Sequence, residues 1–174
     1  MKRPVLVSIV VLMSLLSSCT GYPRFLNFPF DPGGRSLNSP NSELSPQVNA
    51  PYIVFVSDRN GSQDVYLFDA RRRQLIDLPG LNTLDEIASH PAISEDGRYI
   101  VFAGSRQGRA DIYLYDRETQ QKRNLTENLP AEVRNPTIST DGSRIAFEVA
   151  KNGQWDILVC DRNGQLLNIP GNAR

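Results

Sequence analysis

The chain has 174 residues, 40% of them hydrophobic and 22% charged, and its 19 basic and 19 acidic residues balance. This balance offers no basic surface for nucleic acid. A single histidine leaves little from which to build a histidine-based zinc site or a Ser-His-Asp triad. Glycine-rich phosphate loops and Walker-type spacing are also absent from the sequence. We therefore expect no enzymatic activity, no cofactor and no metal.

The first eighteen residues read as a leader. Lys2 and Arg3 precede the apolar residues 5–16, a stretch shorter than the roughly 20 residues that a membrane-spanning helix needs. A basic start and a short apolar stretch are typical of a secretory signal. Residues 16–19, Leu-Ser-Ser-Cys, resemble the lipobox of bacterial lipoproteins. The alternative is an ordinary signal peptide with a chance cysteine at its edge.

The lipobox resemblance implies cleavage before Cys19 and acylation of its thiol, so Cys19 is the expected lipid-attachment residue. More than one acyl chain gives stable anchoring. Thr20 stands where lipoproteins resembling this one often carry the Asp that signals inner-membrane retention, which favours the periplasmic face of the outer membrane. Loss of residues 1–18 leaves 17 basic and 19 acidic residues, a net charge of −2.

Residues 19–40 are expected to form a flexible tether. Pro, Gly, Asn and Ser make up 16 of the 31 residues from 20 to 50, a composition that cannot bury a core. Within it, Phe25, Phe28 and Phe30 cluster between prolines. These rings would bind a partner as a short linear motif, lie on the lipid surface, or cover an exposed blade.

The remainder of the chain repeats itself. Residues 90–126 and 135–171 agree at 13 of 37 positions without a gap, and residues 52–79 match residues 99–126 at 12 of 28 positions. A fixed period of this size indicates a chain of repeated supersecondary units.

Each copy predicts four short strands in meander order. In the middle copy, an extended run at 92–94 ends in the Asp96-Gly97 turn, where glycine supplies a positive φ. β-branched and aromatic residues at 99–102 and 111–116 indicate two buried strands, and 122–126 the last. Hairpin turns are marked at Asn60-Gly61, Gln107-Gly108, Asn152-Gly153 and Asn163-Gly164.

The middle copy resembles the repeat of TolB-type β-propellers. The resemblance rests on Asp96-Gly97-x-x-Ile100-x-Phe102, then Asp111-Ile112-Tyr113, then Asn124-Leu125-Thr126, and it covers roughly residues 40–171. It implies an all-β array of three four-stranded antiparallel blades in domain 41–174, at about 41–79, 90–126 and 135–171.

Three blades are fewer than the four to eight with which propellers close. One face of the first blade and one of the third should therefore be uncovered, carrying Ile53 and Phe55 or their alternates at one end, and Ile145 and Phe147 or theirs at the other. A homodimer would cover both faces and complete a six-bladed ring. The competing arrangement is an open array with the phenylalanine-rich segment folded over one end.

The remaining candidates for chemistry are His90, Cys160 and two periodic sets of aspartates. Asn135 replaces His90 in the next copy, so His90 is interpreted as a hydrogen-bonding residue of the blade. Cys160 lies in an apolar strand and is interpreted as a small buried hydrophobe. Periodic placement favours a structural role over calcium for the aspartates, which are Asp64, Asp111 and Asp156, and Asp69, Asp116 and Asp161.

The sequence thus predicts a lipid-anchored, non-enzymatic interaction module of the cell envelope that binds a protein or peptidoglycan-associated partner. The alternative is a sugar- or peptide-binding sensor, or an accessory propeller of an envelope enzyme. The copies differ most at hairpins 106–109 and 151–154 and in linkers 80–89 and 127–134, so specificity is expected there.

Overall fold

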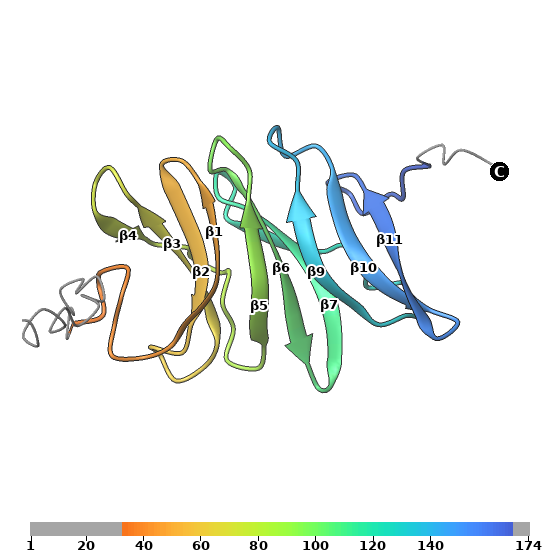
Figure 1. Cartoon of the computed structure of the whole chain (residues 1–174), viewed down its shortest axis with the longest axis horizontal. Helices are drawn as coiled ribbons and strands as arrows, with labels where there is room; N and C mark the ends of the chain where they lie inside the picture. The colour runs from red at the N-terminus through yellow and green to blue at the C-terminus, as the bar shows by residue number, and fades with distance from the viewer. Residues whose placement is uncertain (1–32, 169–174) are drawn as a thin grey trace, which may run out of the picture.

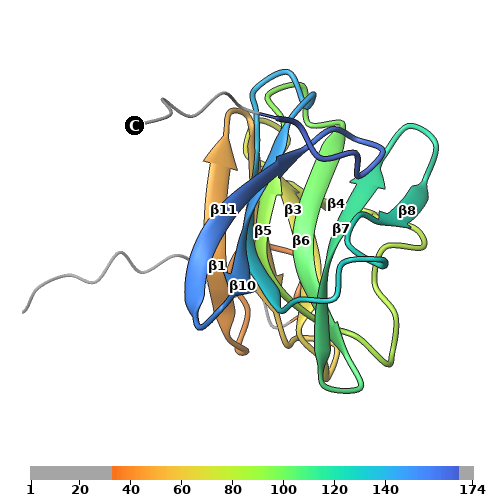
Figure 2. The ribbon, with the colours of Figure 1, turned by 90° about the vertical axis from the view of Figure 1, so that its right-hand side faces the viewer.

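The computed structural model describes residues 33–168. The predicted signal peptide, Cys19 and the phenylalanine-rich segment lie outside the described residues. Within the described part of the chain all regular structure is β, and no helix there is long and apolar enough to cross a membrane. Three antiparallel sheets stand side by side as blades (Figures 1 and 2).

Eleven strands make up the three blades in chain order. Blade 1 holds β1 (Glu43–Asn49), β2 (Tyr52–Ser57), β3 (Asp64–Asp69) and β4 (Gln74–Ile76). Blade 2 holds β5 (Ile87–Ile93), β6 (Tyr99–Arg106), β7 (Arg109–Asp116) and β8 (Gln121–Asn124). Blade 3 holds β9 (Val133–Ile138), β10 (Ile145–Lys151) and β11 (Gln154–Cys160).

The all-β fold and the array of three antiparallel blades are confirmed. Two details differ from the expectation: blades 2 and 3 begin at Ile87 and Val133, earlier than the repeat boundaries suggested, and blade 3 has three strands. Where its fourth strand was expected, one antiparallel bridge joins Cys160 to Leu166. Within the described residues, the fourth strand of blade 3 is therefore represented by this single bridge.

The blades pack face to face because each strand alternates its side chains between two neighbours. Blade 2 lies between two apolar cores. The core shared with blade 1 contains Val54, Val56, Val65, Leu67, Ile100, Phe102 and Tyr115. The core shared with blade 3 contains Tyr99, Val101, Ile112, Leu114, Ile145, Phe147 and Val149.

The first strand of every blade carries the same kink. Ser45, His90 and Asn135 have φ values of 48°, 48° and 51°, and strand pairing shifts register around each of them. A proline follows each residue. His and Asn are among the residues that tolerate the left-handed region best, so the histidine predicted as a hydrogen-bonding residue occupies a β-bulge.

A tyrosine-and-glycine contact holds each blade to the next. An ideal Cβ at Gly97 would lie 2.2 Å from the Tyr52 ring, and one at Gly142 would lie 2.6 Å from the Tyr99 ring. Both glycines also have positive φ, 71° and 70°. Only glycine combines this conformation with so close an approach, which explains the repeated Asp-Gly turn.

This tyrosine-and-glycine contact, called the lock below, is missing at both ends of the array. In blade 3, Arg144 occupies the position of Tyr99, counting from the aligned repeats. In blade 1, the turn between β1 and β2 is Ala50-Pro51, with no Asp-Gly pair. A six-bladed ring of two chains would have to close without the contact that joins the blades within one chain.

Candidate interaction surfaces

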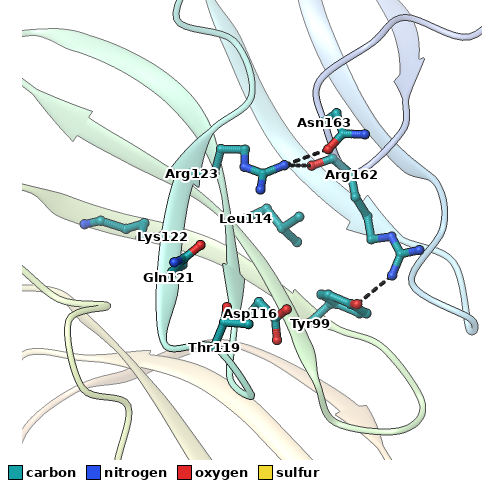
Figure 3. Close-up of a pocket in the computed structure, with 9 residues that line it drawn as sticks. All are labelled: Tyr99, Leu114, Asp116, Thr119, Gln121, Lys122, Arg123, Arg162 and Asn163. Atoms are coloured by element: carbon teal, nitrogen blue, oxygen red, sulfur yellow. Dashed lines mark hydrogen bonds between the residues drawn. The ribbon is translucent and has the colours of Figure 1, made fainter.

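Two equivalent hollows lie where the turns of adjacent blades meet. The hollow between blades 2 and 3, about 380 Å³, is lined by Tyr99, Leu114, Asp116, Thr119, Gln121, Lys122, Arg123, Arg162 and Asn163 (Figure 3). The hollow between blades 1 and 2, about 430 Å³, includes the corresponding Tyr52, Asp69, Gln74 and Arg117.

One arginine of each hollow joins the two blades, Arg162 in the first and Arg117 in the second. Arg162 donates to the Tyr99 hydroxyl at 2.5 Å and stands 4.9 Å from its ring centroid, as Figure 3 shows. Arg117 lies 5.4 Å from the centroid of Tyr52 in the same way. Because the arrangement recurs at both joints, we assign it to blade packing.

Asp116 and Asp69 line the hollows, and Asp161 is their counterpart in blade 3. The Arg98 guanidinium, bonded at 2.8 Å, lowers the pKa of Asp116. Backbone N–H groups of Arg72 and Arg71 lower the pKa of Asp69. Asp161 accepts from the N–H groups of Asn163 and Gln165. This set of predicted aspartates therefore caps the turn after the third strand of each blade.

The other predicted set lies near the start of the third strand in each blade. Asp64 accepts from the Ser62 hydroxyl, and burial raises its pKa. Asp111 accepts from the Thr126 hydroxyl at 3.0 Å and pairs with Arg109, and Asp156 accepts from the Gln154 amide at 2.8 Å. Residues 33–168 contain no group of three His, Cys, Asp or Glu that could hold a metal ion.

Cys160 is buried in the core between blades 2 and 3, with 1% of its surface exposed. Burial, with a smaller contribution from Asp161, raises the pKa of its thiol to about 11. A thiol in this state is a poor nucleophile at neutral pH, so the interpretation as a buried hydrophobe is confirmed.

The hairpins and linkers in which specificity was expected meet at the opposite end of the array. Arg106, at one hairpin, pairs with Asp85 in the first linker at 3.0 Å. Arg109, on the other side of that hairpin, donates to the Glu127 and Leu129 carbonyls in the second linker. Hairpin 106–109 thus contacts both linkers, and the hairpins of the three blades lie along the lower edge in Figure 1.

The outward face of blade 1 is covered by a cluster that the sequence did not reveal. The Arg59 side chain is 4% exposed and pairs with Glu43 at 2.8 Å. Its guanidinium lies over the stacked rings of Phe55 and Tyr66, 4.7 Å from the Tyr66 centroid. Burial, with Asp64 nearby, raises the pKa of Tyr66 to about 12. A cation held this way is desolvated and closely confined.

Arg59 also fixes the chain that leads into blade 1. It donates to the carbonyls of Gly34, Ser36 and Leu37 at 2.9–3.0 Å. The end of the predicted flexible tether that the structure describes is therefore bound to blade 1, and Ser39 is 3% exposed. Arg59 aligns with Arg106 in the repeats, yet the Arg106 side chain is half exposed. The aligned sequence therefore gave no signal for the role of Arg59.

Blade 2 contains the counterpart of this cluster inside the array. Lys122 lies over the stacked pair Phe102 and Tyr113, pairs with the buried Glu86 at 3.0 Å, and donates to the Leu81 carbonyl. Segment 33–39 thus occupies on blade 1 the place that the linker from a preceding blade occupies on blade 2. Phe55 on the expected uncovered face is 1% exposed as a result.

No described residue outside blade 3 covers its outward side. Ile145 and Phe147 point inward, so the alternate residues of its strands form the outward face. Ile157, 64% exposed, pairs there with Glu148 across the sheet. Arg134 pairs with Glu148 and stacks on Trp155 at 3.7 Å. Hydrogen bonds from the Asn135 and Arg134 side chains lower the pKa of Glu148.

Comparisons with known proteins identify the fold. No protein-family model and no curated protein matches the chain. Among solved structures, TolB from Acinetobacter baumannii is 24% identical, with a TM-score of 0.61 over 78% of this chain and 34% of that chain. A putative TolB from Agrobacterium tumefaciens is 18% identical, with a TM-score of 0.58 over 75% of this chain and 48% of that chain.

Propeller domains of peptidases share the same architecture. The β-propeller domain of the Trilobed protease from Pyrococcus furiosus is 14% identical, with a TM-score of 0.55 over 74% of this chain and 42% of that chain. The chain therefore adopts part of a β-propeller. Its blades are TolB-like, and it spans between a third and a half of the propeller structures named here.

Proposed function

We propose that the chain is a lipid-anchored protein–protein interaction module of the bacterial envelope, without enzymatic activity of its own. In this proposal Cys19 carries the acyl chains at the periplasmic face of the outer membrane. The lipobox resemblance and the TolB-like fold support this address, and a protein or peptidoglycan-associated partner binds the blade array.

The observation that carries the proposal is the division of residues between the two ends of the array. Residues shared between copies, such as Gly97 and Gly142 of the Asp-Gly turns and the tyrosines that they contact, join the blades. Charged residues that differ between the copies, Asp85 and Arg109, lie at the hairpin end, where Asp85 pairs with Arg106 and Arg109 donates to the Glu127 carbonyl. A surface built from non-repeated residues on a rigid scaffold is typical of recognition.

A crosslinking pull-down from intact envelopes tests the proposal. Arg106→Lys with Arg109→Gln gives the blade-2 hairpin the residues that the blade-3 hairpin has at these positions, Lys151 and Gln154. Arg123→Gln, at the opposite end, is the matched control. We expect loss of the crosslinked partner with the hairpin variant and its retention with the control.

A partner set unchanged by the hairpin variant would contradict this assignment of the surface. Capture of an envelope enzyme or a glycan by the same hairpin would favour the alternative of an accessory or sugar-binding propeller. Turnover of a substrate by the purified chain would contradict the non-enzymatic part of the proposal.

A further inference from the structure

The outer edge of β11 differs from the corresponding edge of the other two blades. In blade 1, the Asn82 amide fills this edge by accepting from the Val65 N–H at 2.9 Å and donating to the Val65 carbonyl at 3.0 Å. In blade 2, the Thr126 hydroxyl accepts from the Ile112 N–H, and the Leu125 N–H donates to the Ile112 carbonyl. In both blades, the N–H and carbonyl that point away from the second strand at this position are thus hydrogen-bonded.

Ile157 is the counterpart of Val65 and Ile112 in the aligned repeats. The Val159 carbonyl accepts from the Leu167 N–H on the outer side of β11, so Ile157, two residues away, also directs its N–H and carbonyl outward. No other described residue reaches these two groups. The N–H and carbonyl of Ile157 are therefore unused at an exposed edge of β11, an arrangement that favours addition of a strand.

Residue exchanges beside this edge open a hollow of about 790 Å³. Its walls include Ala131, Leu158 and Leu166. In blade 2, the positions of Ala131 and Leu158 hold Glu86 and Tyr113, which fill the corresponding space together with Lys122. The smaller apolar residues of blade 3 leave room for side chains from outside.

One acid at the hollow has lost its cationic partner. In blade 2, Arg109 pairs with Asp111 at 3.1 Å. Gln154 replaces that arginine in blade 3, and Asp156 accepts only from its amide among the contacts of the described residues. Asp156 is therefore free to accept from a hydroxyl, as Asp111 accepts from Thr126.

We propose that the free edge of β11 binds an extended peptide segment of a partner protein, with an apolar residue followed by a hydroxyl residue. The peptide continues the sheet as a fourth strand. Its apolar side chain packs on the exposed Ile157, and the hydroxyl, on the opposite face of the peptide, enters the hollow and donates to Asp156. This inference rests on the proposed interaction function and names the chemistry of the partner.

The size of the edge favours a peptide over a second copy of the chain. The free stretch runs from Gln154 to Ile157, because Leu166 and Leu167 occupy the edge beyond it. Four residues of strand span about 13 Å. A stable dimer buries about 1,200–2,000 Å², whereas a short peptide needs only this edge and the adjoining hollow.

Trp155 makes the proposal directly testable. It is the single tryptophan of the chain and lies on β11, so its fluorescence in the purified full chain reports on the edge. The probe is an end-blocked peptide of residues 124–129, Asn-Leu-Thr-Glu-Asn-Leu, which contains the segment that fills this edge in blade 2. We expect saturable binding, weakened about tenfold when the peptide threonine becomes valine.

Two variants of Ile157 distinguish the contribution of its backbone N–H to peptide binding from that of its side chain. Ile157→Pro removes the outward N–H, a change that an edge strand tolerates because the lost donor faces away from the sheet. Ile157→Ala keeps the N–H and serves as the matched control. We expect Ile157→Pro to abolish peptide binding and Ile157→Ala only to weaken it, with denaturation curves confirming that both variants fold.

Equal binding by the two variants would overturn the inference. So would the absence of wild-type binding up to about 1 mM peptide, the result expected if residues 169–174 occupy the edge themselves. Concentration-dependent dimerisation lost in Ile157→Pro would assign the edge to a second copy and overturn it too. An envelope pull-down that captures the same partners with Ile157→Pro would remove this inference and leave the proposed function standing.

Discussion

Gly97→Ala tests the contact that we hold responsible for joining the blades. The new Cβ has two separate costs. A non-glycine residue at φ 71° costs about 1–2 kcal/mol. Its Cβ would also lie 2.2 Å from Cε2 and 2.5 Å from Cδ2 of Tyr52, and overpacking of this kind costs about 1–3 kcal/mol. We expect a total loss of about 2–5 kcal/mol in the free energy of unfolding.

Gly108→Ala is the control for the backbone cost. Gly108 lies in the same blade with φ 81°, but nothing lies within 4 Å of its ideal Cβ. This variant should lose only about 1–2 kcal/mol. Urea denaturation followed by circular dichroism and by Trp155 fluorescence gives both values, and the slopes must agree for the comparison to hold.

Removal of the ring should rescue the glycine variant. In the Tyr52→Ala background, Gly97→Ala should cost no more than Gly108→Ala, giving a coupling free energy of about 1–3 kcal/mol between positions 52 and 97. Equal losses for Gly97→Ala and Gly108→Ala in the wild-type background, or a coupling near zero, would refute the lock. The Asp-Gly turn would then be explained by its own backbone conformation alone.

Four further outcomes are expected. Cys19→Ser should give an unprocessed or soluble form in cell fractionation, and cleavage and membrane binding as in wild type would contradict the lipobox. Arg59→Ala should lose about 3–5 kcal/mol, because Glu43 stays behind without its partner, and limited proteolysis should then cut within residues 33–42, whereas an uncut segment would show that Arg59 does not hold it. Hydrogen bonds from Ser139 and Ser143 lower the pKa of Asp141 to about 2, so its contribution to stability is full above its ordinary pKa near 4 and is lost as pH falls toward 2; Asp141→Asn should flatten that decline, and an unchanged pH profile would refute the assignment. Light scattering of the full chain in detergent should show a dimer if the six-bladed ring forms, and a monodisperse monomer at tens of micromolar would exclude that ring.

Most of the fold could be predicted from the repeated sequence, because the signals for strands and turns are local. β-branched and aromatic runs separated by Asn-Gly and Asp-Gly pairs specify strands and turns within a few residues of chain. The strands of blade 2 follow from Tyr99 to Asp116 almost as the pattern predicts. The role of Cys160 also followed from its apolar neighbours.

Only the tertiary structure revealed how the ends of the array differ from its interior. Arg59 and Arg106 occupy equivalent positions in the sequence, yet one is buried under the entering chain and the other pairs on the surface. Likewise Ile112 and Ile157 read alike, while Ile112 is fully buried and Ile157 is 64% exposed. A repeated sequence encodes the fold of each blade, but the burial and partners of a residue depend on which blade stands beside it. That neighbour is set by contacts between distant parts of the chain, which no local pattern records.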